Sequence, residues 1–186
     1  MVGKRDKLMI TLMLTNGLRT CEVHRIDIGD FDKIYNRSVI HIQRKGRSFK
    51  QDTVAVPRIV DDLFVDYIAD RDFQADDPLF VNHARGGTGD RLAKTTISAI
   101  VKKRLRSIGI DRPDVSAHSL RHTCGCLMVD MGVDLETIKD MLGHTDTSTT
   151  RIYVNMAQQR RILEQSPAVQ IAGLITKPAK KTRSIR

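Results

Sequence analysis

The sequence Ser-Ala-His-Ser-Leu-Arg-His at residues 116–122 decides how this chain is interpreted. Ser116 is a favoured N-cap residue, and we expect a helix over residues 117–131 that a glycine ends. His118 and Arg121 are three residues apart, so they share one face near the start of this helix. Because the N-terminus of a helix favours phosphate, this stretch predicts a phosphate-binding site.

A second helix and a tyrosine follow this segment. Asp134 is a suitable N-cap for a helix over residues 135–142, and Gly143 ends that helix. His144 comes directly after the glycine, and Tyr153 lies nine residues further on, in a last helical run. This region therefore adds a histidine and a phenolic hydroxyl to the candidate residues.

An arginine follows a glycine turn near the beginning of the chain. Residues 6–16 are apolar on most faces and stop at Gly17, as a buried helix with a glycine C-terminus does. Arg19 follows at the start of a short helix predicted over residues 19–26. Glu22 lies one turn away, and we interpret it as a structural carboxylate that orients Arg19.

The pattern then changes from helical to β. Residues 39–42 and 53–56 are β-branched runs, and the basic segment 44–48 between them predicts a hairpin turn that carries Lys45. Further predictions are helices at residues 57–70 and 94–108 and a loop at residues 82–89. The predicted fold class is α+β, mostly helical with a small antiparallel three-stranded sheet.

Length and composition favour one domain in a reducing compartment. The 186 residues suffice for one ordinary core, which we assign to residues 1–176, with a disordered tail at 177–186. No apolar stretch approaches the roughly 20 residues that span a bilayer. Three cysteines, Cys21, Cys124 and Cys126, are too few for a disulfide framework, so we expect a cytoplasmic protein.

The net charge of +9 suggests a polyanionic partner such as nucleic acid. Five of the cations lie in the tail, which leaves +4 for the rest of the chain, so charge alone is a weak argument. A cluster in the helix predicted over residues 94–108 is either a solvated face or a DNA contact. Its members are Lys102, Lys103, Arg104 and Arg106.

The candidate residue types match the needs of phosphodiester cleavage without a metal. That reaction requires a nucleophile, cationic donors to the non-bridging oxygens and an acid for the leaving oxygen. A tyrosine, two arginines, two histidines and a lysine supply a candidate for each role. The sequence has neither the carboxylate cluster of two-metal nucleases nor a Gly-rich loop that ends in Lys-Ser/Thr.

In order and spacing these residues resemble the signature of the tyrosine recombinase, or phage integrase, family. The resemblance covers about residues 6–157. It is carried by Arg19 in Gly-Leu-Arg-x-x-Glu, Lys45 in the hairpin, His118-x-x-Arg121, Leu-Gly-His144 and Tyr153. It implies the catalytic-domain fold of that family.

The resemblance also implies a reaction on double-stranded DNA. Tyr153 would attack the scissile phosphate, form a 3′-phosphotyrosyl bond and release a 5′-hydroxyl that later attacks a partner strand. Arg19 and Arg121 offer planar forks of donors that suit the charge of the transition state. No cofactor and no metal are expected, and the protein would be a monomer when free and a tetramer on DNA.

The remaining roles follow from the same resemblance. His118 is a candidate general base or acid, and His144 would hydrogen-bond the phosphate. Lys45 resembles the general acid of the family, but the hairpin sequence Arg-Lys-Gly-Arg departs from Gly-Lys-Gly, so Lys50 is a rival. Cys21 also stands where small or hydroxyl residues are usual.

Two features concern regions outside this set. The family normally carries an N-terminal helical domain that clamps the duplex, and we expect this chain to lack it. Residues 157–176 predict a further amphipathic segment interrupted at Pro167. If this segment docks on a neighbouring subunit, truncation at Ala157 is expected to weaken assembly and spare DNA affinity.

Alternative interpretations are a zinc site and two other functions. The zinc site would use four residues that are close in sequence, namely His118, His122, Cys124 and Cys126. On a helix the two thiols point about 200 degrees apart, so they cannot easily bind one metal. We therefore interpret His122 as a packed, hydrogen-bonded residue. The other functions are a non-catalytic DNA-binding relative, using a helix-turn-helix-like pair within residues 116–143, and a type IB topoisomerase. The DNA target and the direction of the reaction are not encoded in any motif.

Overall fold

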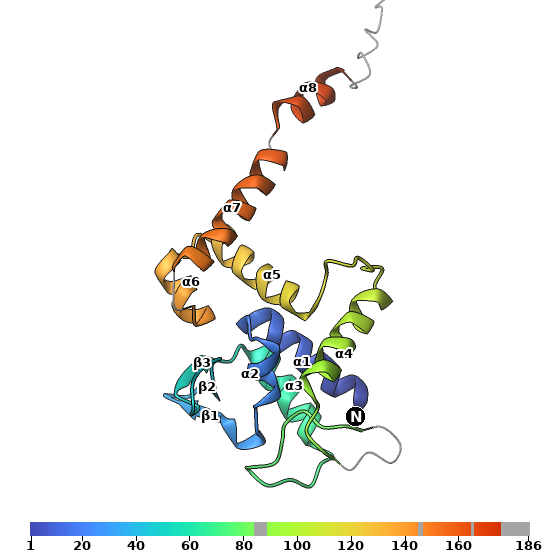
Figure 1. Ribbon diagram of the computed structural model, residues 1–186, viewed down its shortest axis with the longest axis vertical. Coiled ribbons are helices and arrows are strands. Elements are labelled where there is room, and N and C mark those ends of the chain that lie inside the picture. Colours follow the sequence, from blue (N-terminus) through green and yellow to red (C-terminus); the bar gives the residue numbers. More distant parts are fainter. Residues whose placement is uncertain (84–88, 145–146, 165, 176–186) are drawn as a thin grey trace, which may run out of the picture.

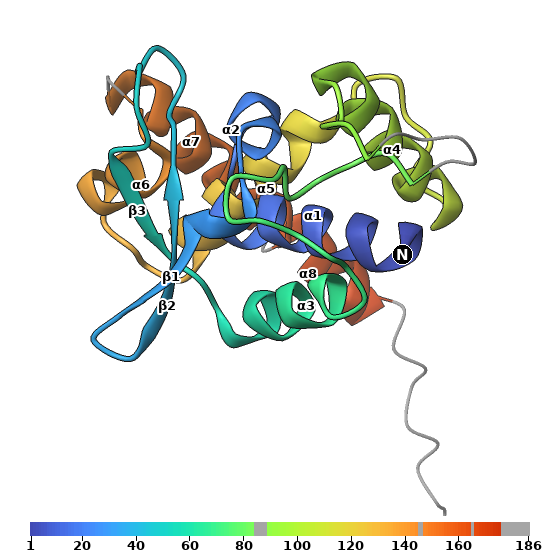
Figure 2. The ribbon, with the colours of Figure 1, turned by 90° about the horizontal axis from the view of Figure 1, so that it is seen from below.

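The computed structural model describes residues 1–83, 89–144, 147–164 and 166–175 (Figure 1). These residues form an α+β fold that is mostly helical, with a small antiparallel sheet at one side of the helical body (Figures 1 and 2), so the predicted fold class is confirmed. Most of the predicted 82–89 loop and the whole predicted tail at 177–186 lie outside the described residues.

Helix α1 (Val2–Asn16) is the central element of the larger core. Its apolar face is buried against α3 (Arg58–Ile68), α4 (Lys94–Ser107) and α5 (Ala117–Asp130) (Figure 2). The buried apolar side chains of α1 are Leu8, Met9, Leu12 and Met13. As predicted, Gly17 ends the helix, with a φ of 61° and a position where a Cβ would collide with Leu142.

The sheet has the strand order β1-β2-β3, with all pairs antiparallel. Its strands are β1 (Phe31–Ile34), β2 (Arg37–Ile42) and β3 (Asp52–Ala55). Strand β2 is central and buries Ile40 and Ile42 in the larger core. The predicted hairpin is confirmed, and its connection over residues 43–51 holds Lys45 beside the helical body.

The short helices and their N-caps set where the segments that carry the candidate residues begin. Helix α2 (Thr20–His24) is shorter than predicted and has Arg19 as its N-cap. The 3-10 helix η1 (Ile28–Asp30) leads into β1. Pro57 is the N-cap of α3 and not its first helical residue, because its ψ of 150° is extended.

A smaller core forms between α5, α6 (Leu135–Leu142) and α7 (Thr147–Glu164). It contains Cys124, Met128, Ile138, Leu142 and Tyr153. The predicted caps are confirmed, since Ser116 accepts the N–H of His118 and Asp134 accepts the N–H of Thr137 at 2.9 Å. Gly143 ends α6 in the left-handed conformation, as the sequence predicted.

The C-terminal part projects from this body (Figure 1). Helix α7 continues beyond Ala157 to Glu164, and α8 (Pro167–Ile175) follows the predicted interruption. Ala157 is buried, and Arg160 forms a 2.9 Å ion pair with Asp130 of α5. The first half of the predicted 157–176 segment therefore belongs to the helix of Tyr153. None of the helices that the structure describes is long and apolar enough to cross a bilayer.

Candidate active site

Arg121 is the most enclosed of the candidate residues. It lies on the first turns of α5 and is only 1% exposed. Its Nη1 donates to the carbonyl of Gly17 at 2.6 Å, and its Nη2 donates to the carbonyl of Leu142 at 2.5 Å. Arg121 thus ties the turn after α1 to the end of α6 and is held in one orientation.

Arg19 lies beside Arg121 and is fixed by a buried carboxylate. Its Nη1 donates to Oε1 of Glu22 and its backbone N–H donates to Oε2, both at 2.8 Å, and Glu22 is fully buried. The predicted structural role of Glu22 is therefore confirmed. Nη1 also donates to the carbonyl of Leu142 at 3.4 Å, so both guanidinium groups meet at one backbone oxygen. Two adjacent cations form a centre that suits a phosphate.

Tyr153 lies on α7, close enough to Arg121 and Arg19 for their charges to act on its hydroxyl. The residue is 2% exposed, and its ring packs over Gly125, where a Cβ would come within 2.8 Å of the ring atoms. Burial raises the pKa of the Tyr153 hydroxyl, while the neighbouring Arg121 and Arg19 oppose this increase. The two arginines thus offset only part of the effect of burial, and the pKa of the hydroxyl stays raised.

His144 stacks beside the tyrosine. The two rings are 5.9 Å apart at an interplanar angle of 18°. Nδ1 of His144 lies 3.0 Å from the hydroxyl of Thr150. Burial and the nearby charges of Arg121 and Arg19 lower the pKa of His144 to about 4, so the ring is neutral at pH 7.

Lys45 and His118 border a shallow depression on the surface that Arg19 also lines. The hollow is lined by Arg19, Thr20, Cys21, Lys45, Lys94, Thr95, Ser98 and His118. Lys45 is exposed, whereas burial lowers the pKa of His118. The structure therefore brings the lysine of the hairpin to the edge of the site, without the fixed contacts that hold Arg121.

The rival Lys50 has a different environment. Its Nζ forms ion pairs with Asp27 at 2.5 Å and with Asp30 at 2.6 Å. Asp27 also pairs with Arg91, so Lys50 belongs to a charge network at the base of the hairpin. It is absent from the lining of the hollow that holds Lys45.

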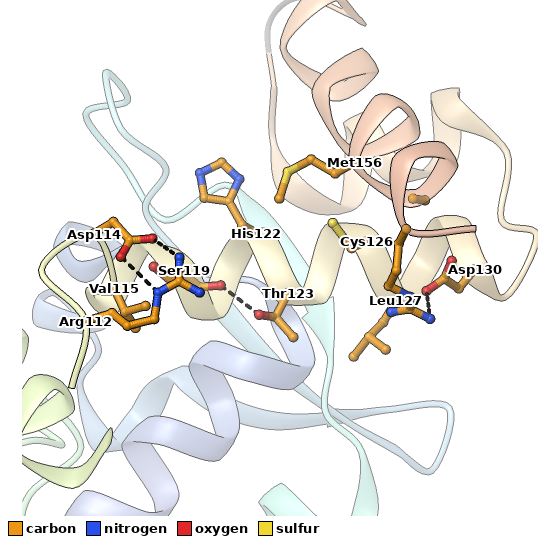
Figure 3. A pocket seen from close by; sticks show the side chains of 12 residues that line it. Arg112, Asp114, Val115, Ser119, His122, Thr123, Cys126, Leu127, Asp130 and Met156 are labelled. Carbon is orange, nitrogen blue, oxygen red and sulfur yellow. Dashed lines mark hydrogen bonds and ion pairs between the residues drawn. The ribbon is translucent and has the colours of Figure 1, made fainter. Parts of the chain in front are cut away.

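His122 lies next to Tyr153, on the side of a second groove. This groove of about 600 Å³ runs between α5 and α7, and Figure 3 shows His122, Cys126 and Met156 along it. The ring of His122 is 4.5 Å from that of His118 and 5.5 Å from that of Tyr153. The predicted packing is confirmed, but the expected hydrogen bonding is incomplete, since Nδ1 is buried without a partner among the described residues.

Two contributors were not found from the sequence. Thr150 is fully buried and contacts His144, and Arg44 is a buried cation beside Glu22 and Gly143. Neither has a local signature, because each acquires its neighbours only through tertiary packing. Two members of the predicted basic cluster of α4 are in ion pairs, Arg104 with Asp6 and Arg106 with Asp111.

Within the part of the chain that the structure describes, no group of three or more His, Cys, Asp or Glu side chains is arranged to hold a metal ion. Cys124 lies 3.6 Å from the carbonyl of Thr15, whereas Cys126 lines the groove between α5 and α7. The two thiols thus face different surroundings.

Comparison with known proteins agrees with this arrangement. The model of the phage integrase family matches residues 2–160. The chain therefore belongs to the phage integrase family, whose members are also called tyrosine recombinases.

Individual relatives share about a third of the aligned residues. Tyrosine recombinase XerC of Corynebacterium efficiens is 31% identical over 159 residues, which are 84% of this chain and 48% of the relative. Tyrosine recombinase XerA of Thermococcus onnurineus is 33% identical over 174 residues, which are 94% of this chain and 59% of the relative. The chain thus spans about half the length of the curated relatives it matches.

A solved structure shows the same fold. The post-cleavage complex of XerH site-specific recombinase with palindromic difH substrate matches with a TM-score of 0.72 and 26% identity. The match covers 88% of this chain and 46% of that one.

Proposed function

We propose that residues 1–176 are the catalytic domain of a site-specific recombinase that cuts and rejoins double-stranded DNA through a 3′-phosphotyrosyl intermediate. The observation that carries this proposal is the meeting of Arg19 and Arg121 at the Leu142 carbonyl beside the buried Tyr153. Relatives named tyrosine recombinases and a homologous complex with DNA support it. The complete set of candidate residues favours an enzyme over a non-catalytic DNA-binding relative.

In the proposed cleavage step, Oη of Tyr153 bonds to phosphorus while the bond to the 5′-oxygen breaks. Arg19 and Arg121 stabilise the extra negative charge on the non-bridging oxygens, as preorganised donors do in other active sites. His118, whose pKa is lowered, is neutral near pH 7 and accepts the phenolic proton. A neutral His144 whose Nδ1 accepts the Thr150 hydroxyl carries its proton on Nε2, from which it donates to the phosphate.

We assign the leaving-group acid to Lys45. The exposed ammonium borders the hollow that also holds Arg19 and His118, so it is free to approach a bound duplex. Lys50 is held by two carboxylates, which would have to release it before it donated a proton. Rejoining reverses these steps, so the energy of the bond is conserved and no cofactor enters the proposed reaction.

The first test is a covalent trapping assay. The protein is mixed with nicked candidate-site DNA, whose cleaved end diffuses away, and a denaturant-stable protein–DNA adduct is measured. We expect an adduct with the wild type and with Tyr35→Phe, whose ring is 97% exposed, and none with Tyr153→Phe. An adduct that persists in Tyr153→Phe would reject this nucleophile. No adduct across a panel of site sequences, with a clamp domain supplied, would favour a DNA-binding relative.

We further propose that the protein is monomeric when free and forms a tetramer on DNA through α8. This helix projects from the body, and its Ile171 and Ile175 are 55% and 77% exposed. Truncation after Glu164 leaves Ala157 and the Arg160–Asp130 pair in place, so it removes α8 without removing the packing of α7. We expect reduced assembly on DNA in sedimentation or native electrophoresis, with DNA affinity maintained. Equal assembly by the truncated form would reject this interface.

We also propose that the protein acts in the cytoplasm, where its DNA substrate is present and thiols stay reduced. Cys21, Cys124 and Cys126 are all free in the structure. Free, partly buried thiols agree with a reducing environment.

A further inference from the structure

Arg44 is a buried cation on an otherwise exposed hairpin. It comes directly before Lys45, yet it is only 6% exposed, whereas Lys45 and Arg47 are exposed. Burial lowers the pKa of the Arg44 guanidinium, which means that enclosing this charge costs free energy. The position of Arg44 therefore needs a compensating set of contacts.

Those contacts join the hairpin to the turn that carries His144. Nη2 of Arg44 donates to the carbonyl of Met141 at 2.8 Å, near the C-terminus of α6, where a positive charge is favourable. The guanidinium lies against Gly143, because a Cβ at that position would come within 2.6 Å of Nε of Arg44. Only the absence of a side chain at residue 143 allows this close approach.

The same guanidinium reaches the carboxylate that holds Arg19. Nη1 of Arg44 is 3.9 Å from Oε2 of Glu22, and Nε is 3.9 Å from Oδ1 of Asp52 on β3. Neither nitrogen has a hydrogen-bond partner among the residues that the structure describes. Leaving two buried donors without partners costs free energy, so the other contacts of Arg44 must outweigh this cost.

The backbone of Arg44 begins the turn that presents Lys45. Its carbonyl accepts the N–H of Arg47 at 3.1 Å and a longer bond from Arg25 at 3.4 Å. A single hollow is lined by both sides of this contact, namely by Arg44, Lys45, Arg47, Asp52, Asp140, Gly143 and His144.

We propose that Arg44 is a positioning residue that fixes the hairpin of Lys45 to the Gly143–His144 turn and to the Glu22–Arg19 pair. This inference rests on the proposed function, because it assigns Arg44 an effect on the leaving-group acid. Arg44 does not touch the DNA, since its Nε and Nη1 are buried. It acts through Lys45, which is exposed and gains a defined starting position from the anchored residue before it.

The test uses two nicked DNA substrates that differ in one atom. In one, the scissile phosphate has its normal 5′-bridging oxygen, and in the other this oxygen is replaced by sulfur. A thiolate is a good leaving group without protonation, so the sulfur substrate bypasses the general acid. Single-turnover cleavage is measured with the full chain for wild type, Arg44→Met, Arg44→Lys, Lys45→Ala and Arg47→Met.

We expect Arg44→Met to cleave the oxygen substrate at least about 10-fold more slowly than wild type and the sulfur substrate within about 3-fold, the pattern of a displaced general acid. Lys45→Ala should show the same pattern with a larger loss, and Arg47→Met should match wild type. Arg44→Lys keeps the charge but lacks the fork of donors, so an intermediate loss on oxygen alone is expected. If Arg44→Met does not fold, Arg44→Lys still tests whether Arg44 positions Lys45.

Equal slowing of both substrates would overturn the proposal, because it would mean that Arg44 only maintains the fold or the arginine pair. Wild-type rates on both substrates would also overturn it. Failure of the proposed function looks different, since the wild type would then form no adduct with either substrate, or Tyr153→Phe would still form one.

Discussion

The pair of Arg19 and Arg121 and the hairpin of Lys45 differ in burial and in the number of fixed contacts, although both border one candidate site. Arg121 is 1% exposed and held by two carbonyls, and Arg19 is held by a fully buried carboxylate. Lys45 is exposed on a loop between two strands. Groups that stabilise charge work best when they are oriented in advance, whereas an acid that must meet a leaving oxygen benefits from approaching after the duplex has bound. Buried, fixed donors and an exposed acid are thus placed on different segments.

The largest effect is expected from removing Arg121. In Arg121→Met, two carbonyls lose charged donors, so we expect cleavage to fall by about 10³-fold and the free energy of unfolding by about 3 kcal/mol. Single-turnover cleavage and urea denaturation measure the two losses. Arg112→Met is the control, because Arg112 is exposed and pairs only at the surface with Asp114. A stable but inactive Arg121→Met would show that the centre is less tightly coupled to the fold than its contacts indicate.

Lys45→Ala tests the exposed hairpin. We expect a loss of roughly 10²-fold in cleavage with a change of less than about 0.5 kcal/mol in stability, because the side chain is exposed. Lys50→Ala is the matched control. It should lower stability by about 1 kcal/mol through its two carboxylates and retain most of the activity. The reverse ranking of the two lysines in activity would make Lys50 the acid.

Gly125→Ala tests how closely the tyrosine is packed. A methyl group would come within 2.8 Å of the Tyr153 ring, so the ring must shift. We expect cleavage to fall by about 10-fold and stability by about 1–2 kcal/mol. Gly3→Ala, which has open space around it, should change neither quantity. Unchanged cleavage in Gly125→Ala would show that Tyr153 leaves this packing before it reacts.

The last prediction concerns the protonation of His144 and its effect on stability. Its pKa is about 4 in the folded chain against 6.5 for an ordinary histidine, so between these values the unfolded chain binds more protons. Stability is therefore lost as the pH falls from about 6.5 to about 4, by up to about 3 kcal/mol, and is unaffected above that range. Thermal denaturation across pH measures the loss. His144→Gln should show a shallower decline than wild type, and parallel curves would contradict this assignment.

Much of the fold was predictable because its signals are local. Ser116, Asp134, Gly17 and Gly143 mark helix ends by their own conformational preferences, and all four predictions are confirmed. The orientation of Arg19 by Glu22 was also predictable, since it depends on a spacing of three residues.

The remaining features depend on contacts between distant segments. Arg44 gains its role from Met141 and Gly143, which lie about a hundred residues away in sequence. The engagement of Lys50 with Asp27 and Asp30 likewise needs the hairpin to fold back on η1. No pattern of hydropathy or spacing reports such pairs, because they arise only when segments distant in sequence pack together.

The hydrogen bonds of Arg121 and Arg19 also have a consequence for protein synthesis. They connect residues separated by 104 and 123 positions, so the partner carbonyl of Leu142 is translated long after Gly17 and Arg19. A ribosome-bound chain that ends before this residue lacks both the oxygen at which the arginines meet and the tyrosine itself. The proposed DNA-cutting centre can therefore assemble only after synthesis has passed Tyr153, and a translation product that stops earlier lacks the centre.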